Sequence, residues 1–270
     1  MKVVKLIIVS ILLSVLTACA TSDPEVDTTN LSSLQNISYQ PTPFMSPKET
    51  SELRVKALED TAMSLGAQGG LAWASEEINH RLVKDKRYLE TVYNFNGMML
   101  THGVIPPVLV EGDNSLNLQD PNTIRVADRT YKIIAQARFA TTAPNWRDYL
   151  WSTYSKPEFP NRAFLPRTKE EKRVWAKAIK LGWDKGIEQS FSIFQQNMAR
   201  LKRDFQGMIL YRKLLQQHMI SPPFVAKTNL GVTGDGGEMR INDQVLRISE
   251  LPQLQTETKD WRAIVVKEND

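Results

Sequence analysis

The longest helical pattern in the chain begins at Thr168 and runs to about Gln217, with the sequence TKEEKRVWAKAIKLGWDKGIEQSFSIFQQNMARLKRDFQGMILYRKLLQQ. Thr168 and Glu171 form a capping box, in which each side chain accepts a hydrogen bond from the backbone amide of the other residue. Apolar side chains then recur every three or four residues, as on one face of an amphipathic helix. They are Val174, Trp175, Ile179, Trp183, Ile187, Phe191, Phe194, Met198, Leu201, Phe205, Met208 and Leu215. This stretch predicts a long helix with one buried face, in which Gly182 and Gly186 either kink the helix or admit a neighbouring one.

A second helical pattern precedes it along the chain. Ser46 is a good N-cap, Pro47 suits the first helical position, and Glu49 completes another capping box. The apolar residues that follow at helical spacing are Leu53, Ala57, Leu58 and Leu65. Three glycines then interrupt the pattern in the run LGAQGGLA at 65–72. A phosphate-binding loop would need Gly-Lys-Ser/Thr after a strand, which is not found here, so we favour close helix packing. A further helix is expected from about Lys84 to Leu100.

Three short segments occur twice in the same order, which indicates an internal duplication. The pairs are FNGMML (95–100) with FQGMIL (205–210), HGVIPPV (102–108) with HMISPPF (218–224), and IRVAD plus YKI (124–133) with MRIND plus LRI (239–248). We therefore predict an α+β fold, with a helix-rich body and two pseudo-repeated units at about 84–135 and 190–250. Each unit reads as a helix, a Pro-Pro break and a β-hairpin, with turns expected at Ala127-Asp128 and Asn242-Asp243. The hairpins either share one sheet or lie on separate faces.

The first eighteen residues have the features of a bacterial lipoprotein signal peptide. Lys2 and Lys5 make the start basic, residues 6–16 are almost all aliphatic, and the run LTAC ends at Cys19, the only cysteine in the chain. The apolar run of about eleven residues is too short to span the ~30 Å of a bilayer core. Cys19 could instead be a small apolar residue in an uncleaved leader, but three independent features favour lipidation. Because Ala20, and not an aspartate, follows the cysteine, we expect sorting to the outer membrane.

Beyond the leader, the sequence divides into a polar segment and a body. Residues 19–46 are rich in Thr, Ser, Asp, Asn and Pro, so we predict a flexible tether that reaches roughly 30 Å beyond the lipidated Cys19. The alternative is that its scattered apolar residues fold onto a partner; these are Leu31, Leu34, Ile37, Tyr39 and Phe44. Residues 47–270 form the α+β body, which we place in the periplasm. With a net charge of +4 and no block of basic residues, direct nucleic-acid binding is not expected.

The body offers no catalytic, cofactor or metal site that its residue spacing selects. His102 and His218 occupy equivalent places before the Pro-Pro pairs, but a metal site would need further converging ligands. A histidine at the end of a helix more often complements the last carbonyl groups. The carboxylates considered for acid–base catalysis are Asp113, Asp120, Asp128, Glu170 and Glu171, and nothing in their spacing selects a pair.

The tryptophans divide into two groups. Trp175 and Trp183 lie on the apolar stripe of the long helix and are expected in the core. Trp146 and Trp151 flank charged residues, and we hypothesise that they anchor a protein interface, where aromatic side chains concentrate.

Several sequence runs resemble a known family. They are GAQGGLA (66–72), PPVLVEG (106–112), WRDYLW (146–151), GIEQ (186–189), ARLKRDF (199–205), GMILYRKLL (207–215) and LGVTGD (230–235). In these the chain resembles the DotC-type lipoproteins of Dot/Icm type IVB secretion systems, which have relatives in IncI-type conjugation systems. The resemblance implies a non-enzymatic subunit of an outer-membrane core complex, which self-associates in a large ring and works with DotD-like and DotH-like subunits. It also implies that the lipoproteins bring the DotH-like subunit to the outer membrane. Only the lipidated Cys19 carries over as a site.

Two classes of function remain in view at this point. The first is a lipid-anchored structural or pilot subunit of a secretion channel, which needs broad interaction surfaces. The second is a periplasmic lipoprotein enzyme or binding protein that acts on cell-wall material, which needs a cleft with converging polar groups. The lack of catalytic spacing favours the first.

Overall fold

The computed structural model describes residues 27–39 and 52–262. They divide into two compact units: unit 1 holds 27–39, 52–73 and 155–187, and unit 2 holds 74–154 and 188–262. The α-helices are α2 (Leu31–Asn36), α3 (Glu52–Lys84), α4 (Lys86–Val92), α5 (Arg147–Leu150) and α6 (Lys169–Gln216). The strands are β1 (Val104–Ile105), β2 (Val108–Asp120), β3 (Thr123–Ala135), β4 (Arg138–Phe139), β5 (Phe224–Gly234) and β6 (Met239–Glu250). Short 3₁₀ helices are η1 (Asn96–Met98), η2 (Thr101–Gly103), η3 (Arg162–Phe164) and η4 (Thr258–Asp260). The α+β class is confirmed.

Helices α3 and α6 each contribute residues to both units. Helix α6 has the extent that the capping box and the apolar stripe predict. Helix α3 continues through the glycines at 65–72 without a break, so these glycines do not interrupt the pattern. The helix expected from Lys84 to Leu100 is shorter, because α4 ends at Val92 and a 3₁₀ turn follows. The predicted capping box at Ser46 lies outside the described residues.

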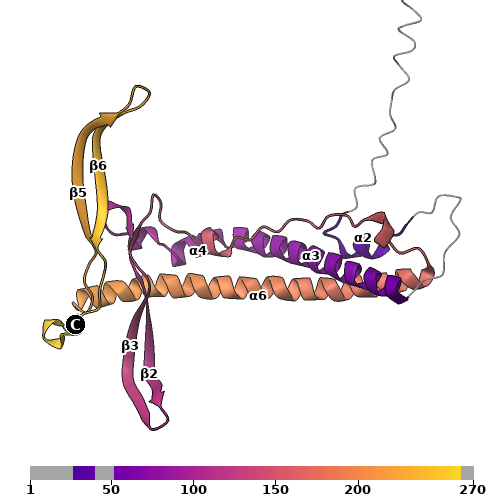
Figure 1. The fold of residues 1–270 in the computed structure, drawn as a ribbon, viewed down its shortest axis with the longest axis horizontal. Coiled ribbons are helices and arrows are strands. Elements are labelled where there is room, and N and C mark those ends of the chain that lie inside the picture. Colours follow the sequence, from indigo (N-terminus) through magenta and orange to yellow (C-terminus); the bar gives the residue numbers. More distant parts are fainter. Residues whose placement is uncertain (1–26, 40–51, 263–270) are drawn as a thin grey trace, which may run out of the picture. The chain divides into compact units, whose positions relative to one another are not determined.

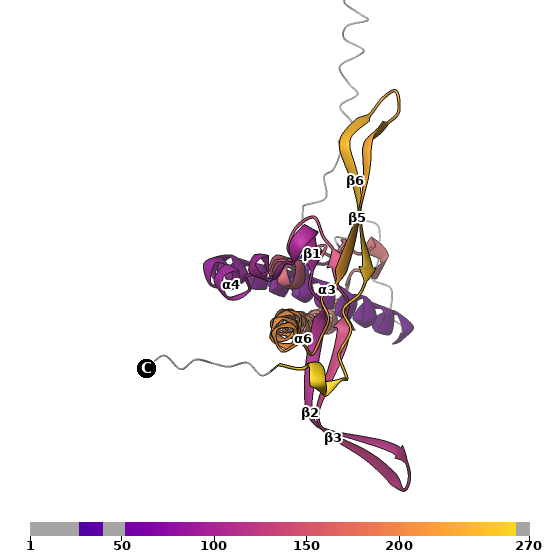
Figure 2. The same ribbon diagram turned by 90° about the vertical axis from the view of Figure 1, so that its left-hand side faces the viewer.

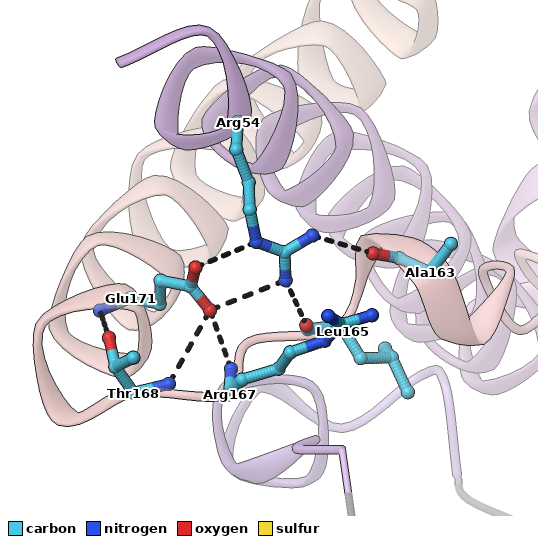
Figure 3. A network of polar contacts seen from close by, with 6 residues as sticks. All are labelled: Arg54, Ala163, Leu165, Arg167, Thr168 and Glu171. Carbon is cyan, nitrogen blue, oxygen red and sulfur yellow. Dashed lines mark hydrogen bonds and ion pairs between the residues drawn. The ribbon is translucent and has the colours of Figure 1, made fainter. Parts of the chain in front are cut away.

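The start of α6 is fixed by the predicted capping box and by a partly buried ion pair (Figure 3). The Glu171 amide donates to Thr168 Oγ1 at 3.1 Å, and the Thr168 amide donates to Glu171 Oε2 at 3.4 Å. Arg54 Nε donates to Glu171 Oε1 at 2.8 Å, and the glutamate side chain is only 2% exposed. Burial alone would raise the pKa of Glu171, but hydrogen bonds from Arg54 and from two backbone amides outweigh it and lower the pKa. The same guanidinium also donates to the carbonyls of Ala163 and Leu165.

In unit 1, α3 and α6 pack backbone to backbone through glycines that alternate between the two helices. A Cβ on Gly66 would overlap the carbonyl oxygen of Ile179, and a Cβ on Gly182 would overlap that of Met63. Gly70 and Gly186 meet the opposite backbone in the same way. The interpretation of the glycine run as a helix-packing surface is therefore confirmed.

The core of unit 1 also includes part of the segment predicted to be a flexible tether. Leu34 is fully buried and Ile37 nearly so, among a set that also includes Leu58, Ala62, Leu65, Leu165, Trp175, Ala178, Ile179 and Trp183. Burying an aliphatic side chain of this size contributes about 1.5–3 kcal/mol. The prediction of a flexible tether is therefore wrong for residues 27–39, because their apolar side chains fold onto the protein's own body.

Unit 2 contains two further clusters of buried side chains. One is built around Phe95, Trp146, Leu150 and Leu201, and the other around Leu109, Tyr211, Leu214 and Ile220. Trp146 is 1% exposed. The hypothesis that Trp146 anchors an interface is therefore wrong, whereas Trp151 is 44% exposed and remains available.

Two long hairpins leave the helices of unit 2 (Figures 1 and 2). Strand β2 pairs with β3, and β5 pairs with β6, each as a separate antiparallel two-stranded sheet. The turns lie at 121–122 and 235–238, so the turns expected at Ala127-Asp128 and Asn242-Asp243 are wrong. Asn242 instead has a positive φ of 57° where the β5–β6 register shifts, as in a β-bulge.

Both proposed repeat units contain a β-hairpin, but the segments that precede the two hairpins differ in secondary structure. Phe95–Leu100 is a 3₁₀ turn with flanking residues, whereas Phe205–Leu210 lies inside α6. His102 and His218 are equivalent in backbone conformation, since their φ angles are 61° and 59°. Further along, Ile124-Arg125-Val126 and Met239-Arg240-Ile241 both follow a hairpin turn.

Candidate interaction surfaces

The outer half of the β2–β3 hairpin carries aliphatic side chains on one face. Leu116 pairs with Val126, and Leu118 pairs with Ile124. Directly opposed residues, and residues two apart on one strand, share a face, so all four lie together. They are 60–71% exposed. The other face is polar, because Asn117 pairs there with Arg125.

The β5–β6 hairpin has a similar face near its turn. Val232 pairs with Ile241, and Met239 lies two residues before Ile241 on the same face. These three side chains are 65–67% exposed. Thr233 and Arg240 are paired on the opposite face. We call these two aliphatic surfaces the hairpin faces.

Among the described residues, no element covers the hairpin faces as the second layer that stabilises a sheet. A two-stranded hairpin is at best marginally stable in water unless it packs against another element. Each hairpin also exposes the backbone groups of its outer edges, which can pair with an added strand. Seven large aliphatic side chains on two such hairpins therefore form surfaces suited to contact with another protein.

A pocket beside β4 contains charged groups, and its Asp204 is held by a hydrogen bond and an ion pair. It has a volume of about 490 Å³ and is lined by residues that include Arg138, Tyr149, Arg200 and Asp204. The Tyr149 hydroxyl donates to Asp204 Oδ2 at 3.2 Å, and Arg203 donates to Asp204 Oδ1 at 2.8 and 2.9 Å. Burial, together with the Asp204 charge, raises the pKa of Tyr149 to about 12. The tyrosine therefore stays protonated at neutral pH and donates its hydrogen bond to Asp204.

His218 has a structural role that its place in the helix explains. The His218 amide donates to Leu215 O, and the next amide, of Met219, donates to Leu214 O. These two bonds form the Schellman motif that ends α6, in which the residue after the cap adopts positive φ. Within 27–39 and 52–262, no group of three His, Cys, Asp or Glu side chains could hold a metal ion.

Three of the five carboxylates considered for catalysis have local partners. Asp120 accepts a hydrogen bond from the Asn122 amide at 2.9 Å in the β2–β3 turn, and Asp113 lies 3.9 Å from Arg129 on the same hairpin. Glu171 holds the start of α6, as described above. These contacts account for the placement of the three side chains without catalysis.

Cys19, the one site predicted from the sequence, lies outside the described residues. No helix in the described part of the chain has a segment apolar and long enough to cross a bilayer. The sequence pattern did not reveal the hairpin faces, because it predicted the turns at other residues. The signals for the correct turns were Asp120-Pro121-Asn122 and the Gly-Asp-Gly-Gly run at 234–237.

Comparison with protein families gives a match over residues 52–263, to the family described as type IV secretory system, conjugal DNA-protein transfer. The chain belongs to this family. Its resemblance to DotC-type proteins is thereby confirmed at the level of the DotC/TraI-like family. No curated protein matches the chain. A member of this family has its partners within the secretion apparatus, which agrees with hairpin faces suited to protein contacts.

Proposed function

We propose that the protein is an outer-membrane lipoprotein that serves as a structural or pilot subunit in the core complex of a type IVB secretion or conjugation channel. It is anchored through lipidated Cys19, with its body in the periplasm, and helps to bring a DotH-like subunit to the outer membrane. The observation that carries this proposal is the family match over 52–263. The lipoprotein-type leader predicted from residues 1–19 supports it.

The hairpin faces supply the contacts that this role requires. We expect them to bind other subunits of the apparatus, among them DotH-like and DotD-like proteins and neighbouring copies of this chain. Their aliphatic side chains gain about 25 cal/mol per Å² of apolar surface removed from water, which favours permanent contacts. We also propose that the two hairpins are the products of an internal duplication, which gives each copy two binding arms of similar design.

Affinity purification from detergent-solubilised envelopes tests the proposal. The wild-type chain is expected to co-purify with other subunits of the secretion system. Cys19→Ser should leave the body folded but remove it from the outer-membrane fraction. If the wild type brings down no other subunit, the scaffold role is refuted, and if Cys19→Ser still fractionates with the outer membrane, the lipid anchor is refuted.

A matched pair of variants separates the hairpin face from the rest of the hairpin. Leu118→Asp places a charge on the aliphatic face of β2, and Asn117→Asp places the same charge on the opposite face one residue earlier. Because both sites are exposed, each change should alter the unfolding free energy by no more than about 0.5 kcal/mol. We expect only Leu118→Asp to reduce co-purification. Equal recovery of partners with both variants would exclude this face as a contact.

A further inference from the structure

The segment that follows the lipidation site is docked on the body, and its contacts can be described residue by residue. Helix α2 has only six residues, too few to be stable alone in water. Asn30 caps it, with its side chain accepting from the Ser32 and Ser33 amides at 2.9 and 3.3 Å. Tertiary contacts must supply the remaining stability. We call residues 27–39 the docked segment.

The tertiary contacts begin with Leu34, whose side chain is fully buried. The Trp175 indole Nε1 donates to the Leu34 carbonyl at 2.9 Å, and both groups are buried. The Gln35 side chain donates to the carbonyl of Ala176 at 3.2 Å. The buried side chain of Leu34, its backbone carbonyl and the Gln35 side chain are thus all held by the first turns of α6.

Further contacts hold the two ends of the docked segment. At its C-terminal end, the Tyr39 amide donates to the Pro166 carbonyl at 3.1 Å, and the Arg167 guanidinium lies 5.0 Å from the centre of the Tyr39 ring. At its N-terminal end, Gly69 of α3 leaves room for the chain, since a Cβ there would lie 2.8 Å from the Thr28 carbonyl oxygen. The docked segment is therefore fixed along its whole length.

Docking shortens the chain between lipid and body. If the whole segment from Cys19 to α3 were free, its 33 residues would give a mean reach of about 32 Å. With the docked segment fixed, only the eight residues 19–26 remain between the lipid and unit 1. As a flexible chain, eight residues would have a mean reach of about 16 Å, and fully extended they span at most about 29 Å.

We propose that the docked segment is a mount that holds unit 1 close to the membrane surface, so that the lipid anchor limits the distance of the body as well as its location. This proposal rests on the proposed lipidation of Cys19. Unit 1 is then connected to the lipid anchor at the docked segment, beside the N-terminal end of α6. Its distance from the membrane surface cannot exceed the length that residues 19–26 can span.

Two insertions of equal length test the mount. About twenty Gly/Ser residues inserted within 20–26 should raise the mean reach from about 16 Å to about 29 Å. The same insertion within 40–51 lies after the docked segment and should leave the distance unchanged. If residues 19–51 formed one free tether, both insertions would instead extend the mean reach equally, from about 32 Å to about 40 Å.

Energy transfer measures the distance. The lipidated full chain is reconstituted into phosphatidylethanolamine–phosphatidylglycerol vesicles that contain a small fraction of acceptor-labelled lipid. The donor is placed at Lys180→Cys, where the side chain is 64% exposed; the thiol of Cys19 is blocked by lipid. We expect only the insertion within 20–26 to lower the transfer. An equal decrease with both insertions, or no change with either, overturns the mount.

A third variant releases the docked segment. Leu34→Asp buries an unpaired charge in the core of unit 1, so the docked segment should detach, and the insertion within 40–51 should then lower the transfer as well. Gly69→Ala is a milder alternative if Leu34→Asp impairs folding, which circular dichroism reveals. If the insertion within 40–51 still has no effect in a folded, undocked variant, the mount is refuted.

Failure of lipidation gives a different result. In that case no variant associates with the vesicles, and both the anchor and the mount are refuted. Hydrogen exchange of the soluble Cys19→Ser chain then still examines the docking itself: slow exchange of the Leu34 and Tyr39 amides supports it, and exchange at the rate of an unstructured peptide excludes it.

Discussion

Replacing Gly66 with alanine should destabilise unit 1, although alanine is the better helix former. In an exposed helix this substitution gains about 1 kcal/mol. In unit 1, however, the new Cβ would overlap the carbonyl oxygen of Ile179 and lie 3.0 and 3.1 Å from its carbonyl carbon and Cα. These are backbone atoms of α6, which cannot rotate aside as a side chain could. The two helices must therefore separate locally.

The expected magnitude follows from this separation. Overpacking typically costs 1–3 kcal/mol, and a gap of 0.5–1 Å already forfeits a quarter to a half of the dispersion energy of each contact. Because the affected contacts include the buried side chains of Leu65 and Ile179, we place the cost at the upper end of this range. After subtracting the gain in helix propensity, we expect a net loss of about 2 kcal/mol.

Urea unfolding followed by far-UV circular dichroism measures this loss on the Cys19→Ser chain. With a denaturant dependence of about 2–3 kcal/mol per molar, 2 kcal/mol lowers the midpoint by about 0.7–1 M. Gly97→Ala is the control, because a Cβ there meets nothing within 4 Å, and it should change stability by less than about 0.5 kcal/mol. If Gly66→Ala proves neutral or stabilising while the control behaves as expected, the two helix backbones do not meet at this glycine.

A double mutant shows whether Gly66 and Gly182 report on one contact. A Cβ on Gly182 would overlap the Met63 carbonyl oxygen, so Gly182→Ala alone should cost about as much as Gly66→Ala. Once one alanine has separated the helices, the second meets less resistance. The double variant should therefore lose less than the sum of the single losses, whereas strict additivity would mean that the two glycines pack independently.

Three further predictions follow from particular contacts. The pKa of Glu171 is lowered in the folded chain. The stability that ionised Glu171 contributes is therefore present above the pKa of the unfolded chain and is lost as the pH falls through the pKa of the folded chain. Glu171→Gln should reduce this acid dependence of stability, which urea midpoints measured at several pH values will show. Trp146→Ala should cost about 3–5 kcal/mol, whereas Trp151→Ala should be mild by the same assay; equal losses would contradict the difference in burial. His218→Gly should raise stability by up to about 1 kcal/mol, because glycine adopts positive φ without strain, and His218→Ala should not.

The long helix α6 could be predicted because its signals are local. The Thr168–Glu171 capping box and the apolar stripe up to Leu215 act between residues three or four positions apart, so the sequence pattern and the observed α6 agree. The glycine run at 65–72 was interpreted correctly as a helix-packing surface. For Gly182 the sequence left open a kink or a neighbouring helix, and the structure shows the neighbouring helix. The family resemblance likewise depends on sequence runs alone, and the match over 52–263 confirms it.

The hairpins were predicted in kind but not in register. Asn242-Asp243 is a good turn sequence, yet it lies within β6, because cross-strand pairing placed the turn at the Gly-rich run before it. Register depends on which residues of two strands face each other, and this is set by many weak pairs along the whole hairpin. The hairpin faces, which consist of such pairs, therefore became visible only in the folded chain.

The sequence by itself determined the long helix α6 and the family, because each is encoded in neighbouring residues. The lipoprotein-type leader ending at Cys19 stays a prediction. Only the tertiary structure decided that Trp146 is buried, that the hairpins carry bare aliphatic faces, and that residues 27–39 dock on unit 1. The docked segment is polar in composition, and its apolar residues Leu31, Leu34 and Ile37 are too few to predict a stable helix. Its stability comes from Trp175, Pro166 and Gly69, which lie far from it in sequence, so no local pattern could have predicted it.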